Sequence, residues 1–86
     1  MRDEYLYRHA ERIHKVFEKF GFKWGESIPT EEDIYYTLEQ IVGDLRESDF
    51  DWIETGRILV MKNMDSPVGY DIYVDVGDIE WFDLLW

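Results

Sequence analysis

The chain contains few of the residue types that perform covalent or metal-dependent chemistry. His9 and His14 are its only histidines, and it has no cysteine. Side chains five residues apart on a helix, at about 100° per residue, point about 140° apart, so these two histidines cannot share a metal ion. The missing cysteine also excludes disulfides, thiolate zinc sites and cysteine nucleophiles. We therefore expect neither a metal nor another cofactor.

The sequence motifs of common catalytic sites are missing as well. The glycine motifs of nucleotide sites, the G-x-S-x-G of hydrolases and the H-E-x-x-H of metalloproteases do not occur. Residues 49–54 begin like a calcium loop, but Ile53 and Glu54 stand where that loop needs a ligand and a glycine. Twenty acids make any carboxylate pair of the glycosidase type uninformative. We therefore predict that the protein is not an enzyme. An enzyme that uses scattered carboxylates is the least favoured interpretation, behind the two binding functions considered below.

Net charge is the strongest signal in the sequence. The chain has nine basic and twenty acidic residues, a net charge of −11. Residues 1–23 carry six bases and four acids, whereas residues 24–86 carry three bases and sixteen acids. Such a field repels nucleic acids and anionic membranes, so we expect neither as a direct partner. A small domain needs a net charge of magnitude only about 2–8 to be soluble. The larger negative charge of this chain therefore favours a role in binding a partner.

Length and composition are those of one folded domain. Eighty-six residues are enough for a single domain, residues 1–86, and 17% of them are aromatic, which disfavours intrinsic disorder. The first residues lack the apolar region of a signal peptide, and no apolar run approaches the ~20 residues that span a bilayer. We therefore expect a cytoplasmic protein.

Two amphipathic helices are predicted in the first half of the chain. Residues 3–20 place apolar side chains at helical spacing, and Gly21 can adopt the positive φ that ends a helix. Thr30 is a predicted N-cap for a second helix over residues 31–47, with acids in its first turn. The two predicted apolar stripes are Leu6, Ala10, Ile13, Phe17 and Phe20 in the first helix, and Ile34, Leu38, Ile41, Val42 and Leu45 in the second.

The second half of the chain favours strands. Residues 57–63 are rich in β-formers, residues 65–69 are dense in turn residues, and residues 71–76 alternate. This alternation predicts a hairpin with one buried face and one solvated, acidic face, the latter carrying Asp71, Tyr73 and Asp75. Residues 78–86 fit either a third strand or a short docking helix. Together these elements predict an α+β domain, in which two N-terminal helices pack on a small antiparallel sheet.

Acidic residues beside aromatic ones are the best candidates for a binding surface. Carboxylates two residues apart on a strand are about 6.6 Å apart and can imitate part of a phosphate track. Tyrosine and tryptophan are enriched at interface hot spots, although Trp24, Trp52 and Trp81 are each more simply interpreted as core. The predicted partner-binding residues are Asp49, Asp51, Asp71, Tyr73, Asp75, Asp78, Glu80, Trp81, Asp83 and Trp86.

The favoured interpretation is a small acidic inhibitor that occupies a basic, nucleic-acid-binding groove of a partner protein. DNA mimics of phages that block restriction or CRISPR enzymes have this general character, as do immunity and antitoxin proteins. The alternative is a non-enzymatic assembly or accessory subunit. It would associate with itself, as a possible homodimer, or with another chain through its apolar C-terminal tail and its charge asymmetry.

Overall fold

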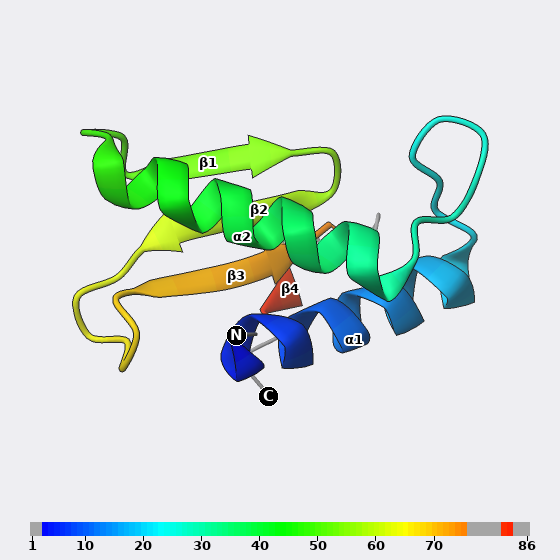
Figure 1. Cartoon of the computed structure of the whole chain (residues 1–86), viewed down its shortest axis with the longest axis horizontal. Coiled ribbons are helices and arrows are strands. Elements are labelled where there is room, and N and C mark those ends of the chain that lie inside the picture. The colour runs from blue at the N-terminus through cyan, green and yellow to red at the C-terminus, as the bar shows by residue number, and fades with distance from the viewer. Residues whose placement is uncertain (1–2, 76–81, 84–86) are drawn as a thin grey trace. The chain divides into compact units, whose positions relative to one another are not determined.

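The α+β class predicted from the sequence is confirmed by a computed structural model, which describes residues 3–75 and 82–83. Two helices, α1 (Glu4–Phe20) and α2 (Glu31–Glu47), precede the strands β1 (Trp52–Thr55), β2 (Ile58–Lys62), β3 (Tyr70–Val74) and β4 (Phe82–Asp83) (Figure 1). Contacts group the chain into two compact units, residues 1–40 and residues 41–86. Each unit is described separately, and α2 contributes residues to both.

Helix α1 begins and ends with well-formed caps. The Asp3 carboxylate accepts hydrogen bonds from the backbone N–H groups of Tyr5 and Leu6, which the first turn leaves without helical partners. At the other end Gly21 adopts a φ of +69°, as predicted, and Phe22 N–H donates to the Phe17 carbonyl. This pairing is a Schellman motif, and the rings of Phe17 and Phe22 make the hydrophobic contact that accompanies it, at 5.8 Å between centroids.

The first unit packs α1 beside the beginning of α2. Tyr7 Oη donates to the Glu31 carboxylate at 3.3 Å, and the Tyr35 hydroxyl accepts from Asp3 N–H at 2.9 Å. Thr30 caps α2 as predicted, because its Oγ1 accepts from Asp33 N–H while the Asp33 carboxylate accepts from Thr30 N–H. The predicted first stripe is confirmed except at its end, where Phe20 is 50% exposed, and the buried residues of α1 are Leu6, His9, Ala10, Ile13 and Phe17.

The second unit is built on an antiparallel sheet in the order β1-β2-β3-β4. Strand β1 was not predicted; it pairs with β2 across a two-residue turn that starts with Gly56, at a φ of +54°. Strands β2 and β3 form the predicted hairpin. Strand β4 pairs with the end of β3, so the strand alternative holds for residues 82–83.

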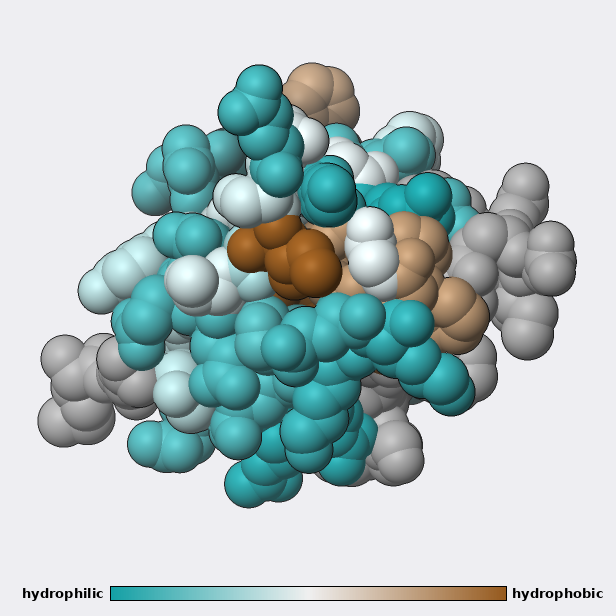
Figure 2. All heavy atoms as spheres, turned by 90° about the vertical axis from the view of Figure 1, so that its right-hand side faces the viewer, coloured by the Kyte–Doolittle hydropathy of each residue, from teal (hydrophilic) through white to brown (hydrophobic). Residues whose placement is uncertain are grey.

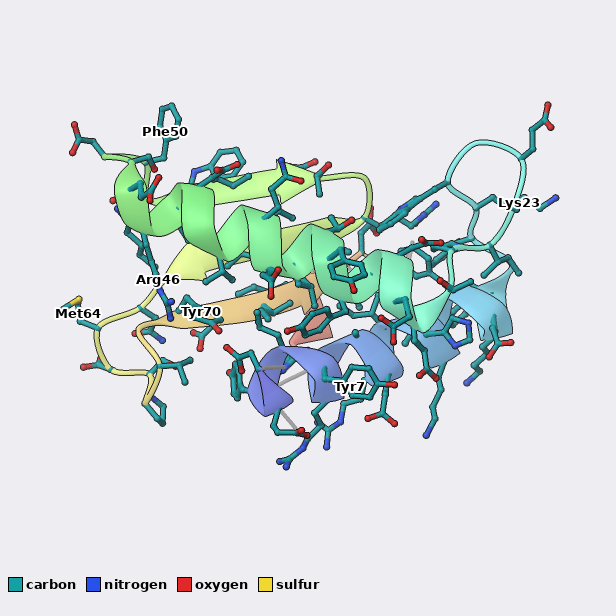
Figure 3. The ribbon with its side chains drawn as sticks, in the orientation of Figure 1. Tyr7, Lys23, Arg46, Phe50, Met64 and Tyr70 are labelled. Carbon is teal, nitrogen blue, oxygen red and sulfur yellow. The ribbon has the colours of Figure 1, made fainter. Side chains whose placement is uncertain are left out.

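One face of this sheet belongs to the core. Opposite residues in an antiparallel pair share a face, and the fully buried Ile58, Val60, Ile72 and Val74 all lie on the same one. The end of α2 contributes to the same unit: the guanidinium of Arg46 lies 5.5 Å from the centre of the Tyr70 ring (Figure 3). The apolar stripe predicted for the second helix is buried throughout.

Polar residues dominate the one face of the protein that Figure 2 draws. Hydrophilic residues cover most of the face drawn in Figure 2, and the strongly apolar ones are confined to a small area. Neither α1 nor α2, the helices of the described residues, has the length and apolarity that crossing a bilayer requires.

Candidate partner-binding surface

The register of the sheet places two of the predicted residues, Asp71 and Tyr73, on the face opposite the apolar core. Trp52 lies opposite Met61, and Met61 lies opposite Asp71. Glu54 lies opposite Leu59, and Leu59 lies opposite Tyr73. We call this the acidic sheet face, and its residues are Trp52, Glu54, Leu59, Met61, Asp71 and Tyr73.

Asp71 does not have the solvated position that the alternation predicted. Only 7% of its surface is exposed, and its carboxylate accepts a hydrogen bond of 2.5 Å from Asn63 Nδ2. The prediction failed because β3 is an inner strand, whose side chains have neighbours on both sides, whereas alternation alone assumes an open face. The buried carboxylate therefore stabilises the turn that precedes β3.

Asp75 is also partly engaged within the protein. Its carboxylate lies 3.8 Å from Arg57 Nη1, and both side chains are roughly one-third exposed. Arg57 Nη1 also donates to the Asp75 carbonyl, and Asp75 N–H donates to the Arg57 carbonyl, which extends the pairing of β2 with β3. Tyr73 is half-buried on the acidic sheet face.

The remaining predicted residues of the C-terminal segment are only partly within the structure. The backbone of Asp83 pairs opposite that of Tyr73 in β4. Asp78, Glu80, Trp81 and Trp86 lie outside the described residues. Their role at a binding surface stays a prediction.

Asp49 and Asp51, in contrast, lie in the exposed stretch 49–52, in which acidic and aromatic residues alternate. We call residues 49–54 the acid–aromatic segment. Phe50 is 66% exposed and Trp52 is 52% exposed, so the interpretation of Trp52 as core is wrong. Asp49, Asp51 and Glu54 are exposed as well. Aromatic rings and carboxylates are thus exposed together along this segment.

Local hydrogen bonds explain why the segment leaves the helix in this way. Ser48 follows the last residue of α2, and its Oγ donates to the Leu45 carbonyl and accepts from Phe50 N–H. Lys62 then fixes the backbone twice: its Nζ donates to the Ser48 carbonyl and its backbone N–H donates to the Asp51 carbonyl, both at 2.8 Å. The main chain is held while the Phe50 ring points away from the end of α2 (Figure 3).

The three cations of residues 41–86 are all occupied elsewhere. The Arg46 guanidinium lies over the Tyr70 ring, that of Arg57 contacts Asp75, and the Lys62 ammonium donates to a backbone carbonyl. Among the described residues, no ion pair joins a cation to Asp49, Asp51 or Glu54. The three carboxylates of the acid–aromatic segment therefore form no ion pair within residues 3–75, although the Lys62 ammonium, bonded to the Ser48 carbonyl, lies near them.

No family model, curated protein or solved structure matches the chain. Its function has to be inferred from its own surface.

Two open depressions border the exposed aromatic rings. One, of about 420 Å³, is lined by residues 50–54 alone, and the other, of about 180 Å³, is lined by Trp52, Glu54, Leu59 and Met61. Their carboxylates could act as general bases, but neither depression contains a histidine, serine, threonine or lysine, so neither pairs such a nucleophile with a general base. Within the described part of the chain, no group of three or more His, Asp or Glu side chains could hold a metal ion. These depressions offer apolar contact beside negative charge.

Sequence reasoning missed three exposed residues of the acid–aromatic segment, namely Phe50, Trp52 and Glu54. The available signal was the strict alternation of acid and aromatic residues from 49 to 52, followed by a glycine at the usual position of a tight turn. A tryptophan at 52 suggested core because large aromatic side chains are mostly buried. Its position on an edge strand leaves it exposed.

Proposed function

We propose that this chain is a small acidic inhibitor that binds a basic protein surface and occupies the groove in which the partner holds nucleic acid. The observation that carries the proposal is the acid–aromatic segment. Its exposed carboxylates of Asp49, Asp51 and Glu54 form no ion pair among the described residues, and exposed Phe50 and Trp52 alternate with Asp49 and Asp51 in the sequence. An isolated solubilising surface does not require exposed aromatic rings at alternate positions.

The charge and the rings have separate roles in such a complex. Uncompensated carboxylates attract a lysine- and arginine-rich groove over several ångströms and speed the encounter. Aromatic side chains then supply apolar contact area and fix the register, as they do at interface hot spots. Arginine side chains of the partner can also stack on the Trp52 indole. The partner class that fits this chemistry is a nuclease or another protein that handles nucleic acids.

Capture by single-charge variants of the protein tests the proposal. The parent, Asp51→Lys and the matched control Glu26→Lys are immobilised, exposed to cell extract at low salt and eluted with a salt ramp. Glu26 is exposed in the loop before α2, so both variants change the net charge equally while only one alters the acid–aromatic segment. We expect the parent and Glu26→Lys to retain a nucleic-acid-binding protein that Asp51→Lys retains about tenfold less tightly, a difference of ~1.4 kcal/mol.

Competition with nucleic acid completes this test. If the protein occupies a nucleic-acid groove, added duplex DNA releases the captured partner at constant salt. A partner that all three columns retain equally, or that duplex DNA does not displace, would contradict the proposal.

A further inference from the structure

Strand β1 forms an edge of the sheet, because the strand order places β2 on one side and no described strand on the other. The Asp51 carbonyl accepts from Lys62 N–H, and Thr55 pairs with Ile58 at the turn. In an antiparallel ladder the residues that bond to the neighbour alternate with those that do not. The backbone N–H and C=O groups of Trp52 and Glu54 therefore point away from β2, to the outside of the sheet.

This edge is protected against strand pairing by negative charge and not by lysine, proline or a bulge. Proteins commonly guard an exposed edge with lysine, proline or a bulge, and residues 52–55 contain no lysine and no proline. The pairing of β1 with β2 is also regular, with one residue opposite one residue over all four positions. What the edge does carry is negative charge, from Glu54 within β1 and from Asp49 and Asp51 just before it.

Charge decides which strand this edge accepts. A second copy of the chain would bring its own carboxylates beside those of the first, and like charges on neighbouring strands are destabilising. An extended segment that carries lysine or arginine at alternate positions would instead place its cations on the acidic sheet face, beside Glu54 and the Trp52 indole. We therefore expect β1 to pair with a basic strand and not with the β1 strand of a second copy.

We propose that β1 accepts an extended basic segment of the partner protein as an added strand. This inference rests on the proposed function and specifies how the surface engages its partner. Four residues of β1 span about 13 Å, so the added segment pairs over four or five residues. Backbone hydrogen bonds to Trp52 and Glu54 hold the added strand. The alternate side chains, which lie on the acidic sheet face, favour a positively charged segment.

Two synthetic peptides of equal charge separate strand addition from simple attraction. The first is a capped hexapeptide of alternating threonine and lysine; the second has the same sequence with every backbone nitrogen methylated, which removes its hydrogen-bond donors. Binding is followed by NMR of the isotope-labelled protein, together with the exchange rates of its amide protons. We expect the first peptide to bind at least tenfold more tightly and to slow the exchange of the Trp52 and Glu54 amides.

Equal binding of the two peptides, or unchanged exchange at both amides, overturns strand addition. It leaves the proposed function standing, because that function is judged by capture and DNA competition with the Asp51→Lys variant. Conversely, a failure of capture with retained peptide pairing overturns the inhibitor proposal and leaves the edge as a peptide-binding site.

Two variants of the protein also separate strand addition from simple charge attraction. Glu54→Gln removes the charge and keeps the outward N–H, whereas Glu54→Pro removes both and leaves the bonds to β2 intact, since this N–H points outward. We expect Glu54→Gln to weaken peptide binding less than threefold and Glu54→Pro to weaken it at least tenfold. Equal affinities of the two variants would overturn the proposal. If Glu54→Pro does not fold, the exchange rates in the parent protein decide.

Discussion

Replacing Asn63 by alanine tests whether Asp71 is a structural carboxylate. In the parent protein Asn63 makes two hydrogen bonds: Nδ2 donates to the Asp71 carboxylate, and Oδ1 accepts from Asp65 N–H at 2.9 Å. Losing a bond to a charged group costs about 1.5–3 kcal/mol, and losing a neutral bond costs about 0.5–1.5 kcal/mol. We therefore expect Asn63→Ala to lower the free energy of unfolding by about 2–4 kcal/mol.

The size of the effect depends on the burial of Asp71. Only 7% of the surface of Asp71 is exposed, so water cannot replace the lost Asn63 donor. The carboxylate then stays buried without a hydrogen-bond donor from Asn63. Asp71→Asn keeps the geometry but exchanges a charge-assisted bond for a neutral one of about half the strength, so we expect a smaller loss, of about 1 kcal/mol.

Urea denaturation at pH 7, followed by far-ultraviolet circular dichroism, measures these differences. Asp65→Ala is the matched control, because it alters the same exposed turn but keeps the backbone N–H that bonds to Asn63. We expect this control to change the unfolding free energy by less than about 0.5 kcal/mol. If Asn63→Ala costs no more than Asp65→Ala, Asp71 is not held by Asn63 and its description as a structural carboxylate is refuted.

Three further predictions concern the first unit and the assembly state. Phe17→Ala should cost about 3–5 kcal/mol in thermal or urea unfolding, because the ring is fully buried against Phe22 and Trp24; a loss below 1 kcal/mol would contradict that packing. Thr30→Ala should cost about 1 kcal/mol through loss of the cap to Asp33, and Thr30→Ser should restore most of it. Sedimentation from low to high salt should show one unchanging species, whereas dissociation with rising salt would support the assembly alternative.

The helices could be predicted from the sequence because their signals are local. Thr30 caps the start of α2 and Gly21 ends α1, and both roles depend on backbone geometry within one turn. The buried stripes follow from apolar residues spaced three and four positions apart. Phe20 departs from its stripe because it is the last residue of α1 and lies beside the αL turn at Gly21. Its ring instead stacks on that of Phe22, at 5.5 Å between centroids.

The candidate surface was harder to predict because it depends on strand order. Alternation in residues 71–76 gives two faces, but it does not show that β3 is an inner strand and β1 an edge strand. That order buries Asp71 and exposes Trp52, the reverse of what their residue types suggest. Asp49 and Asp51 were predicted correctly as exposed acids, since they lie in the connection after α2 and need no knowledge of the sheet.

An edge strand protected by the net negative charge of the chain loses that protection where the net charge falls to zero. Near pH 4.4, the isoelectric point expected from the sequence, net repulsion between copies is smallest while the outward backbone groups of Trp52 and Glu54 are unchanged. Mild acid should thus promote pairing between the β1 edges of different copies, and the precipitate should contain fibrils or ladders of these edges. Preparations meant to stay monomeric belong well above that pH.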